Sequence, residues 1–276
     1  MQDPATTQPI AVNKVIDDNT ETWVIAGKGE SIAGGATGLV ERLPSGDVVK
    51  SPWPSRFHDN HKGMANEAQI YEILGAHPRL VKMVDWDSET CCLTMEYMPN
   101  GNLNDYLRAH NDKISLVQRL QWILEAAEGL QLLHSADIMH CDVEPKNFLL
   151  DEDLSLRISD FSGSSIKGAQ PTAHAGTRFS QPSYDWRYAP TIQDDLFAFG
   201  STIHTIVTGL YPFQEIDSDE VIKRYEAQEW PNVTGILCGG IIERCWRCEI
   251  ASAQEIYDTI QEKIKTGKIA IPFLAL

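Results

Sequence analysis

The spacing of apolar and polar residues divides the chain into a strand-rich first third and a mostly helical remainder. From about residue 22, short runs of alternating apolar and polar residues are separated by Gly and by the turn sequence Pro44-Ser-Gly-Asp. Such runs are typical of strands joined by tight turns, and they predict strands over residues 22–26, 38–43, 47–50, 80–86 and 91–97. Apolar residues at helical spacing predict one helix over residues 62–75, ending at Gly75.

Beyond Gly101 the apolar spacing becomes mostly helical. The longest predicted helix covers residues 116–134, with Ser115 and Gln118 as a capping box. Further helices are predicted over residues 194–208, 218–228, 237–247 and 252–265. Residues 1–20 show little apolar periodicity and predict a flexible N-terminal tail. We therefore expect an α+β protein of two lobes: a small antiparallel β lobe with one helix over residues 21–98, and a larger, mainly helical lobe over residues 99–276.

Charge and composition narrow the range of functions. The 276 residues include 23 Lys and Arg against 39 Asp and Glu, a formal net charge of −16. We expect no nucleic-acid partner and no membrane association, because both need an extended basic face and no apolar run approaches the length of a membrane helix. A local phosphate site needs only a few placed cations and stays possible. Six scattered cysteines and the absence of an apolar leader predict a cytoplasmic protein, with the nucleus as the alternative.

The densest group of candidate functional residues lies within residues 138–163. Asp142 and Asn147 follow one another closely, and Asp160 comes in the next apolar run. Flanking apolar residues predict short buried strands, which would hold these three side chains in place. Carboxylate and amide oxygens are ligands that suit Mg²⁺ together with phosphate and water. The segment therefore predicts a magnesium–nucleotide site.

These residues also resemble motifs of the eukaryotic protein-kinase family. The catalytic loop H-R-D-x-x-x-x-N of that family stands here as His140-Cys141-Asp142 followed by Asn147, and its D-F-G motif as Asp160-Phe161-Ser162. The resemblance covers residues 28–265. Other matching positions are Gly35, Gly38 and Val40 of the glycine-rich loop, Lys50 and Glu67 of the ion pair, the hinge from Leu93 to Met98, and the helix that begins near Asp195.

The resemblance implies a two-lobed kinase fold, ATP and Mg²⁺ as cofactors, and a role for each matching residue. Asp142, Lys146 and Lys50 would be catalytic, Asp142 by receiving the substrate hydroxyl and Lys146 by supplying positive charge. Asn147 and Asp160 would bind Mg²⁺. The nucleotide would contact Gly35, Gly38, Val40, Lys50, Glu67 and the backbones of Glu96 and Met98.

Several positions depart from the family pattern. Glu144 stands where many members carry a Lys, and we expect it to turn outward or to pair with Lys146. Cys141 replaces an Arg that often pairs with a phosphorylated activation loop, so control by such phosphorylation is not expected. Ser162 replaces the glycine of D-F-G, and we expect Gly163 to supply the backbone freedom. Ala33 replaces the first glycine of the loop, and Ser183 replaces a Glu whose Arg partner is not evident near Ile250.

We favour an ATP- and Mg²⁺-dependent protein kinase acting on Ser or Thr rather than Tyr, although Lys146 and the Cys245-Trp246 pair are features of the tyrosine-specific variant. One alternative is a pseudokinase that binds nucleotide and acts as a scaffold or regulatory module. A less favoured one is a small-molecule phosphotransferase with a comparable loop. We expect a monomer whose partner is a protein substrate, with a preference for basic substrates because the chain is acidic.

Overall fold

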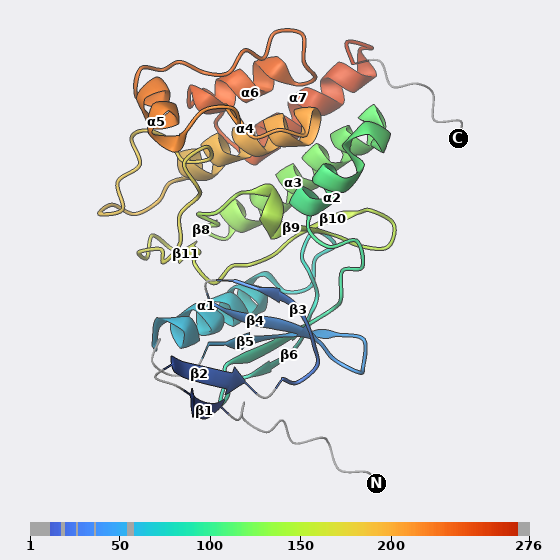
Figure 1. The fold of residues 1–276 in the computed structure, drawn as a ribbon. Coiled ribbons are helices and arrows are strands. Elements are labelled where there is room, and N and C mark those ends of the chain that lie inside the picture. Colours follow the sequence, from blue (N-terminus) through green and yellow to red (C-terminus); the bar gives the residue numbers. More distant parts are fainter. Residues whose placement is uncertain (1–11, 18–19, 26, 36, 54–57, 270–276) are drawn as a thin grey trace. The chain divides into compact units, whose positions relative to one another are not determined.

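The computed structural model describes residues 12–17, 20–25, 27–35, 37–53 and 58–269 (Figure 1). Two compact units are present. One contains the described residues up to Ala68 together with Lys82–Tyr97, and the other contains Gln69–Val81 and the described residues from Met98 onward.

An antiparallel sheet of five strands forms the main part of the first unit. Its strands, in spatial order, are β3 (Glu30–Gly34), β4 (Gly38–Arg42), β5 (Val48–Pro52), β7 (Cys92–Met95) and β6 (Met83–Asp87). The central strand β5 is buried at every position, which explains its run of apolar residues around Lys50. Strand β3 is exposed at every position, and this is why the apolar pattern did not predict it. The antiparallel sheet itself is confirmed.

A separate hairpin precedes this sheet. Strand β1 (Val12–Asp17) pairs in antiparallel register with β2 (Thr20–Ile25). Of the range 1–20 that was expected to be a flexible tail, residues 12–17 and 20 belong to these strands, because they form backbone ladder bonds that a weak apolar period does not reveal. Residues 1–11 and 18–19 of that range lie outside the described residues, as does Ala26 of the predicted strand over residues 22–26.

Helix α1 (His58–Leu74) confirms the helix predicted over residues 62–75 and begins earlier. It ends where Gly75 adopts a left-handed conformation with φ of 65°, and the amide of Gly75 donates to the carbonyl of Tyr71. A glycine in this position is a common helix stop because it has no Cβ to oppose a positive φ. The helix carries Glu67 toward its middle, in the first unit.

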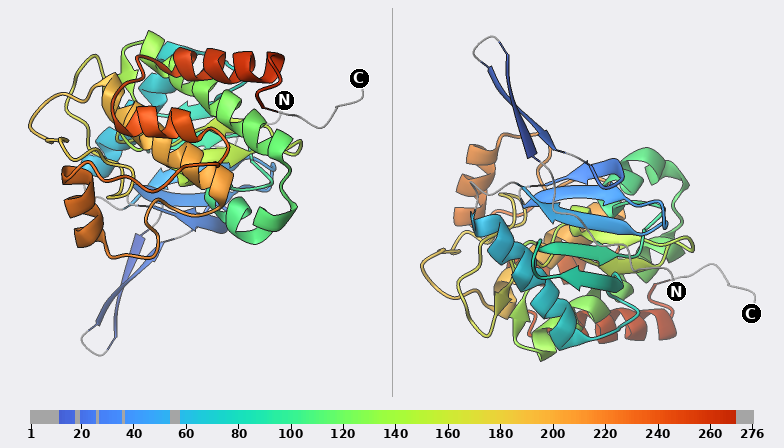
Figure 2. Two further views of the ribbon diagram at one scale, coloured as in Figure 1. Left: turned by 90° about the horizontal axis from the view of Figure 1, so that it is seen from above. Right: turned by 90° about the horizontal axis from the view of Figure 1, so that it is seen from below.

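Helices make up most of the second unit. They are α2 (Leu103–His110), α3 (Leu116–Ser135), α4 (Ile192–Thr208), α5 (Ser218–Glu226), α6 (Gly239–Trp246) and α7 (Ala253–Lys265), with 3-10 turns at Asn111–Lys113 (η1) and Pro145–Asn147 (η2). Helix α3 packs against α4 and α7, and α4 packs against α6, as the views of Figure 2 show. The side chain of Ser115 accepts from the amide of Gln118, so the predicted N-terminus of α3 is confirmed.

Two short antiparallel strand pairs frame the candidate functional segment. Strand β8 (Ile138–Met139) pairs with β11 (Ser165–Ile166), and β9 (Phe148–Leu150) pairs with β10 (Leu156–Ile158). Phe148, Leu150, Leu156 and Ile158 are fully buried. The predicted buried supports for Asp142, Asn147 and Asp160 are therefore present.

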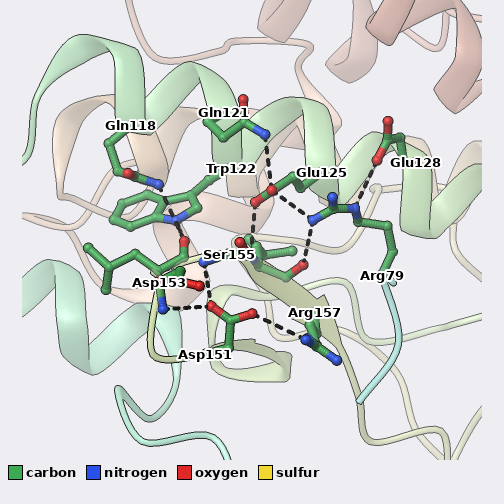
Figure 3. A network of polar contacts seen from close by, with 12 residues as sticks. Arg79, Gln118, Gln121, Trp122, Glu125, Glu128, Asp151, Asp153, Ser155 and Arg157 are labelled. Atoms are coloured by element: carbon green, nitrogen blue, oxygen red, sulfur yellow. Dashed lines mark hydrogen bonds and ion pairs between the residues drawn. The ribbon is translucent and has the colours of Figure 1, made fainter. Parts of the chain in front are cut away.

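A polar network fixes the residues next to the β9–β10 hairpin (Figure 3). Arg79 forms ion pairs with Glu125 at 2.7 Å and with Glu128 at 2.9 Å. The buried Glu125 also accepts from the backbone amide of Leu156 at 2.8 Å. Because a buried carboxylate is stable only when its oxygens are satisfied, this network holds β10 against α3.

No helix among the described residues is long and apolar enough to span a membrane.

Candidate functional site

In the first unit, a buried ion pair joins β5 to α1. The ammonium of Lys50 lies 2.6 Å from Oε2 of Glu67, and the two residues are 7% and 1% exposed. Burial of either charge alone is costly, so each stabilises the charged form of the other. The pair fixes an ammonium group on the central strand of the sheet, which is the arrangement needed to hold an anionic group.

A tight turn connects β3 to β4 near this cation. The amide of Gly35 donates to the carbonyl of Gly38 at 2.9 Å, and Val40 lies opposite Lys50 in the ladder between β4 and β5. A Cβ at Gly38 would lie 2.1 Å from the carbonyl oxygen of Ser51, so only glycine fits there. The predicted positions Gly35, Gly38 and Val40 therefore lie on one hairpin that borders the strand of Lys50.

Trp53 also belongs to this hairpin region, and the sequence analysis did not select it. Its indole Nε1 donates to the carbonyl of Gly35 at 2.8 Å, and its backbone amide donates to the carbonyl of Thr37 at 3.3 Å. The contact depends on the pairing of Gly38 with Pro52, which the sequence alone does not reveal. Trp53 thus holds the glycine-rich turn from the neighbouring strand.

The two predicted hinge residues fall on opposite sides of a unit boundary. Glu96 belongs to the first unit, where its carboxylate accepts from the amide of Lys82 at 2.7 Å. Met98 belongs to the second unit, is buried, and accepts from the amide of Gly101 at 3.0 Å through its carbonyl. Both are therefore held by local bonds within their own unit.

In the second unit, Asp142, Lys146 and Asn147 come together. The side-chain amide of Asn147 donates to the backbone carbonyl of Asp142 at 2.7 Å and to its Oδ2 at 2.9 Å. The Lys146 ammonium lies 3.1 Å from the same Oδ2. Oδ1 of Asp142 is buried and has no hydrogen-bond partner in the part of the chain that the structure describes. One carboxylate oxygen is thus fixed by two contacts, and the other has none among the described residues.

Asp160 lies on the segment next to Asn147. The amide and the hydroxyl of Ser159 both donate to the carbonyl of Asn147, at 3.0 and 3.1 Å. Asp160 itself has a φ of 62°, and its Oδ1 accepts from the Ser162 hydroxyl at 3.0 Å. The following Phe161 is fully buried and makes edge contacts with neighbouring rings. Asn147 and Asp160 are therefore positioned by adjacent, hydrogen-bonded segments.

The donors in this region fit a magnesium ion that is shared with phosphate. Because the nitrogen of the Asn147 amide is used by Asp142, its oxygen is the group that could bind a cation, beside the carboxylate of Asp160. Among the described residues, no group of three or more His, Cys, Asp or Glu side chains could hold a metal by itself. Mg²⁺ commonly takes one or two protein oxygens and completes its shell with phosphate and water.

Asp195 supports the loop that carries Asp142. Its buried carboxylate accepts from the amides of His140 and Cys141 at 2.8 and 2.9 Å, and it contacts Nε2 of His134 at 2.9 Å. Burial alone raises the pKa of Asp195, but the hydrogen bond and charge of His134 outweigh it and hold this pKa below its ordinary value. The N-cap of α4 is Thr191, so Asp195 is a support for the loop and not a helix cap.

Glu144 is buried, although one of the two expectations was that its side chain turns outward. It is 7% exposed, its Oε2 lies 3.5 Å from the Lys146 ammonium, and its Oε1 accepts from the amide of Gly176 at 2.6 Å. The expectation that it turns outward is wrong, and the expected pairing with Lys146 is confirmed. Burial, and next the charge of Asp142, raise the pKa of Glu144. The contact with Gly176 had no signal in the sequence.

The role expected for Gly163 is also wrong in one respect. Gly163 does not adopt a positive φ, so it does not provide the backbone freedom lost at Ser162. A Cβ on Gly163 would lie 2.1 Å from the Cβ of Ala173, and this close approach is what requires a glycine. Asp160 adopts the positive φ in this segment instead.

Ser183 lines a cavity of about 320 Å³ together with Arg247. An Arg therefore does lie close to Ile250 in the sequence, although the expectation was that none is evident there. The guanidinium of Arg247 pairs with Glu243 at 2.7 Å. Ser183 is uncharged, so it cannot form the ion pair that the family pattern has at this position.

Comparisons with known proteins agree on one family. The model of the protein tyrosine and serine/threonine kinase family matches residues 46–261. A protein of Acanthamoeba polyphaga mimivirus named as a serine/threonine-protein kinase/receptor, R826, is 30% identical over 265 residues, 87% of this chain and 15% of its own length. From Arabidopsis thaliana, the receptor protein-tyrosine kinase CEPR1 is 32% identical over 64% of this chain and 21% of its own. The Arabidopsis serine/threonine-protein kinase PBL28 is 36% identical over 60% of this chain and 49% of its own. The chain thus spans less than half the length of each.

Proposed function

Because this chain belongs to the protein tyrosine and serine/threonine kinase family, we propose that it transfers the γ-phosphoryl group of ATP to a hydroxyl group of a protein. The observation that carries the proposal is the state of the Asp142 carboxylate. Oδ2 is held by Asn147 and Lys146, and the buried Oδ1 is left without a hydrogen-bond partner among the described residues. A buried acceptor with no partner is costly unless a ligand supplies the donor.

The substrate hydroxyl is that donor in the proposed mechanism. Oδ1 of Asp142 orients the hydroxyl and accepts its proton as the oxygen attacks the γ-phosphoryl group, while ADP leaves. The Lys146 ammonium stays beside Oδ2 and offsets the negative charge that gathers around the reacting phosphoryl group. In-line positioning of this kind accounts for most of the rate enhancement in phosphoryl transfer.

The remaining predicted residues would bind the nucleotide. Lys50, held by Glu67, would contact its α- and β-phosphates, and the Gly35–Gly38 turn would cover the phosphates with backbone amides. Asn147 and Asp160 would hold Mg²⁺, which supplies charge neutralisation at the phosphate oxygens. The backbones of Glu96 and Met98 would contact the base.

Serine and threonine are the acceptors that we propose in preference to tyrosine. Relatives named for either specificity match this chain, and Lys146 is a feature shared with the tyrosine-specific variant. The net charge of −16 favours basic protein substrates through electrostatic attraction. We further propose a cytoplasmic monomer whose two lobes are residues 21–98 and residues 99–276, with neither nucleic acid nor membrane as a partner.

One observation favours a second function, that of a nucleotide-binding pseudokinase. Burial, and next the charge of Asp142, raise the pKa of Glu144, and the Glu144 carboxylate adds a negative charge beside the proposed base. Such a charge opposes the approach of a phosphate group. Lys146 contacts both carboxylates and offsets part of this charge, and for that reason we favour the active enzyme.

The test is transfer of label from γ-labelled ATP to generic protein substrates with Mg²⁺, followed by identification of the labelled amino acid. Asp160→Asn is the control, because it keeps the size of the side chain and removes the charge that would bind the metal. Label on Ser or Thr that is lost in Asp160→Asn supports the proposal. Thermal stabilisation by Mg²⁺-ATP without any transfer by the unaltered chain would favour the pseudokinase.

A further inference from the structure

The side chain of Glu144 joins two segments that lie 32 residues apart in the sequence. Its Oε1 accepts from the amide of Gly176 at 2.6 Å, and its Oε2 faces the Lys146 ammonium at 3.5 Å. Lys146 in turn contacts Oδ2 of Asp142 at 3.1 Å. A continuous path of polar contacts therefore runs from the proposed base to the segment around Gly176.

The surroundings of Glu144 fix its position. The preceding Val143 is buried, and its carbonyl accepts from the hydroxyl of Thr202 on α4 at 2.8 Å. The following Pro145 is buried and begins the η2 turn. A Cβ at Gly176 would lie 3.1 Å from Oε1 of Glu144, so the carboxylate fills the space against the glycine backbone. Because a charge-assisted hydrogen bond to a backbone amide strengthens when water is excluded, this contact is suited to ordering the Gly176 segment.

Two positions from which a cation could order the same segment through a phosphate do not provide one. Cys141, the residue before Asp142, is a buried thiol, and burial raises its pKa so that it stays uncharged. Arg178 lies two residues beyond Gly176, but its guanidinium donates to the carbonyls of Phe213 and Ile216. Neither residue offers a free positive charge near Gly176.

We propose that Glu144 is a positioning residue that holds the segment around Gly176 and the Lys146 ammonium in fixed places relative to Asp142. The segment is thereby ordered by a carboxylate of the chain itself, without phosphorylation. The catalytic consequence of this contact rests on the proposed function, whereas the ordering of the segment does not.

The ordering is tested by amide hydrogen exchange over residues 174–180 in nucleotide-free, phosphatase-treated protein. Glu144→Ala removes the acceptor and should increase the exchange rate of the Gly176 amide at least tenfold. Glu144→Gln keeps an acceptor oxygen and should give a smaller increase. Glu152→Ala changes an exposed Glu of the β9–β10 turn and should leave this rate unaltered. Equal rates in the unaltered chain and Glu144→Ala would overturn the proposal.

Steady-state kinetics supply the second arm. Glu144→Ala should raise KM for a peptide substrate and lower kcat while KM for ATP changes less than twofold, and Glu144→Gln should restore part of the loss. Unchanged peptide KM and kcat would overturn the positioning role.

If Glu144→Ala does not fold, Gly176→Ala provides the same test, because the added methyl group crowds Oε1 while Glu144 remains. If the unaltered chain shows no transferase activity, the proposed function is contradicted. The exchange experiment would still test whether Glu144 orders the segment around Gly176.

Discussion

Asn147 donates its side-chain amide to Oδ2 of Asp142 at 2.9 Å, so the two oxygens of that carboxylate differ in their surroundings. The same Oδ2 faces Lys146 at 3.1 Å, whereas the buried Oδ1 has no hydrogen-bond partner among the described residues. In the proposed mechanism the two oxygens of this carboxylate have different tasks, orientation for Oδ2 and acceptance of a proton for Oδ1.

The Lys50–Glu67 pair should contribute to stability as a unit. Lys50→Met leaves the buried Glu67 carboxylate without its ammonium partner and is expected to lower the free energy of unfolding by about 2 to 4 kcal/mol. The double variant Lys50→Met/Glu67→Leu should lose less than the sum of the single variants, with a coupling of about 1 kcal/mol or more. Urea denaturation of the four proteins measures the coupling, and additive losses would contradict it.

Trp53 should strengthen nucleotide binding through the glycine-rich turn. Trp53→Phe keeps an aromatic ring and removes the indole donor to the Gly35 carbonyl, a loss worth about 1 kcal/mol. Affinity for Mg²⁺-ATP is then expected to fall about fivefold in calorimetric titration. Trp186→Phe is the matched control, since Trp186 is 73% exposed. Equal affinity of Trp53→Phe and the control would show that the bond does not hold the turn.

Two glycines of the same hairpin should differ in their tolerance of a methyl group. A Cβ at Gly38 would lie 2.1 Å from the backbone oxygen of Ser51, whereas a Cβ at Gly35 would meet no atom within 4 Å. Gly38→Ala must displace a strand and should cost about 1 to 3 kcal/mol. Gly35→Ala should change stability by less than about 0.5 kcal/mol. Thermal unfolding of the two variants compares them directly, and a larger loss for Gly35→Ala would contradict the geometry.

His204 should make stability depend on pH near neutrality. Burial lowers the pKa of His204 below 6.5, although its hydrogen bond to the carbonyl of Leu210 acts in the opposite direction. The unfolded chain therefore binds a proton first as the pH falls, so this contribution to stability is complete above about pH 6.5 and is lost at lower pH. The free energy of unfolding should decrease from pH 7.5 to pH 5.5, and the decrease should be smaller in His204→Gln. An identical pH dependence in this variant would contradict the assignment.

Elements with a buried face were the ones that the sequence predicted well. Helix α3 was predicted from its apolar face and the cap at Ser115, and β5 from its short apolar run. Strand β3 is exposed along its length and α2 is short, so neither produced a clear period. Strand β1 depends on backbone pairing with β2, which is a property of two segments and not of one.

The residues of the candidate site also differ in how well the sequence predicted them. Asp142, Asn147 and Asp160 were found because their residue types and order follow a known pattern, and the structure brings the first two into direct contact. The sequence did not predict the contact of Trp53 with Gly35 or that of Glu144 with Gly176, because these contacts depend on strand register and on the approach of Gly176. Gly163 was selected for its flexibility, whereas its neighbour Ala173 is what requires it. The contacts of these residues depend on which segments lie close together in the folded protein, and a sequence alone does not reveal this.

The most direct test of the account compares the unaltered chain with Asp142→Asn in a Mg²⁺-ATP-dependent phosphoryl-transfer assay, with nucleotide affinity measured in parallel. The asparagine side chain keeps the shape of the aspartate but replaces the proton-accepting carboxylate. Transfer by the unaltered chain should fall at least 100-fold in kcat, in the range usual for loss of a general base, while the Kd for Mg²⁺-ATP changes less than twofold. Equal rates in the two proteins, or no transfer by the unaltered chain, would contradict the role assigned to Asp142.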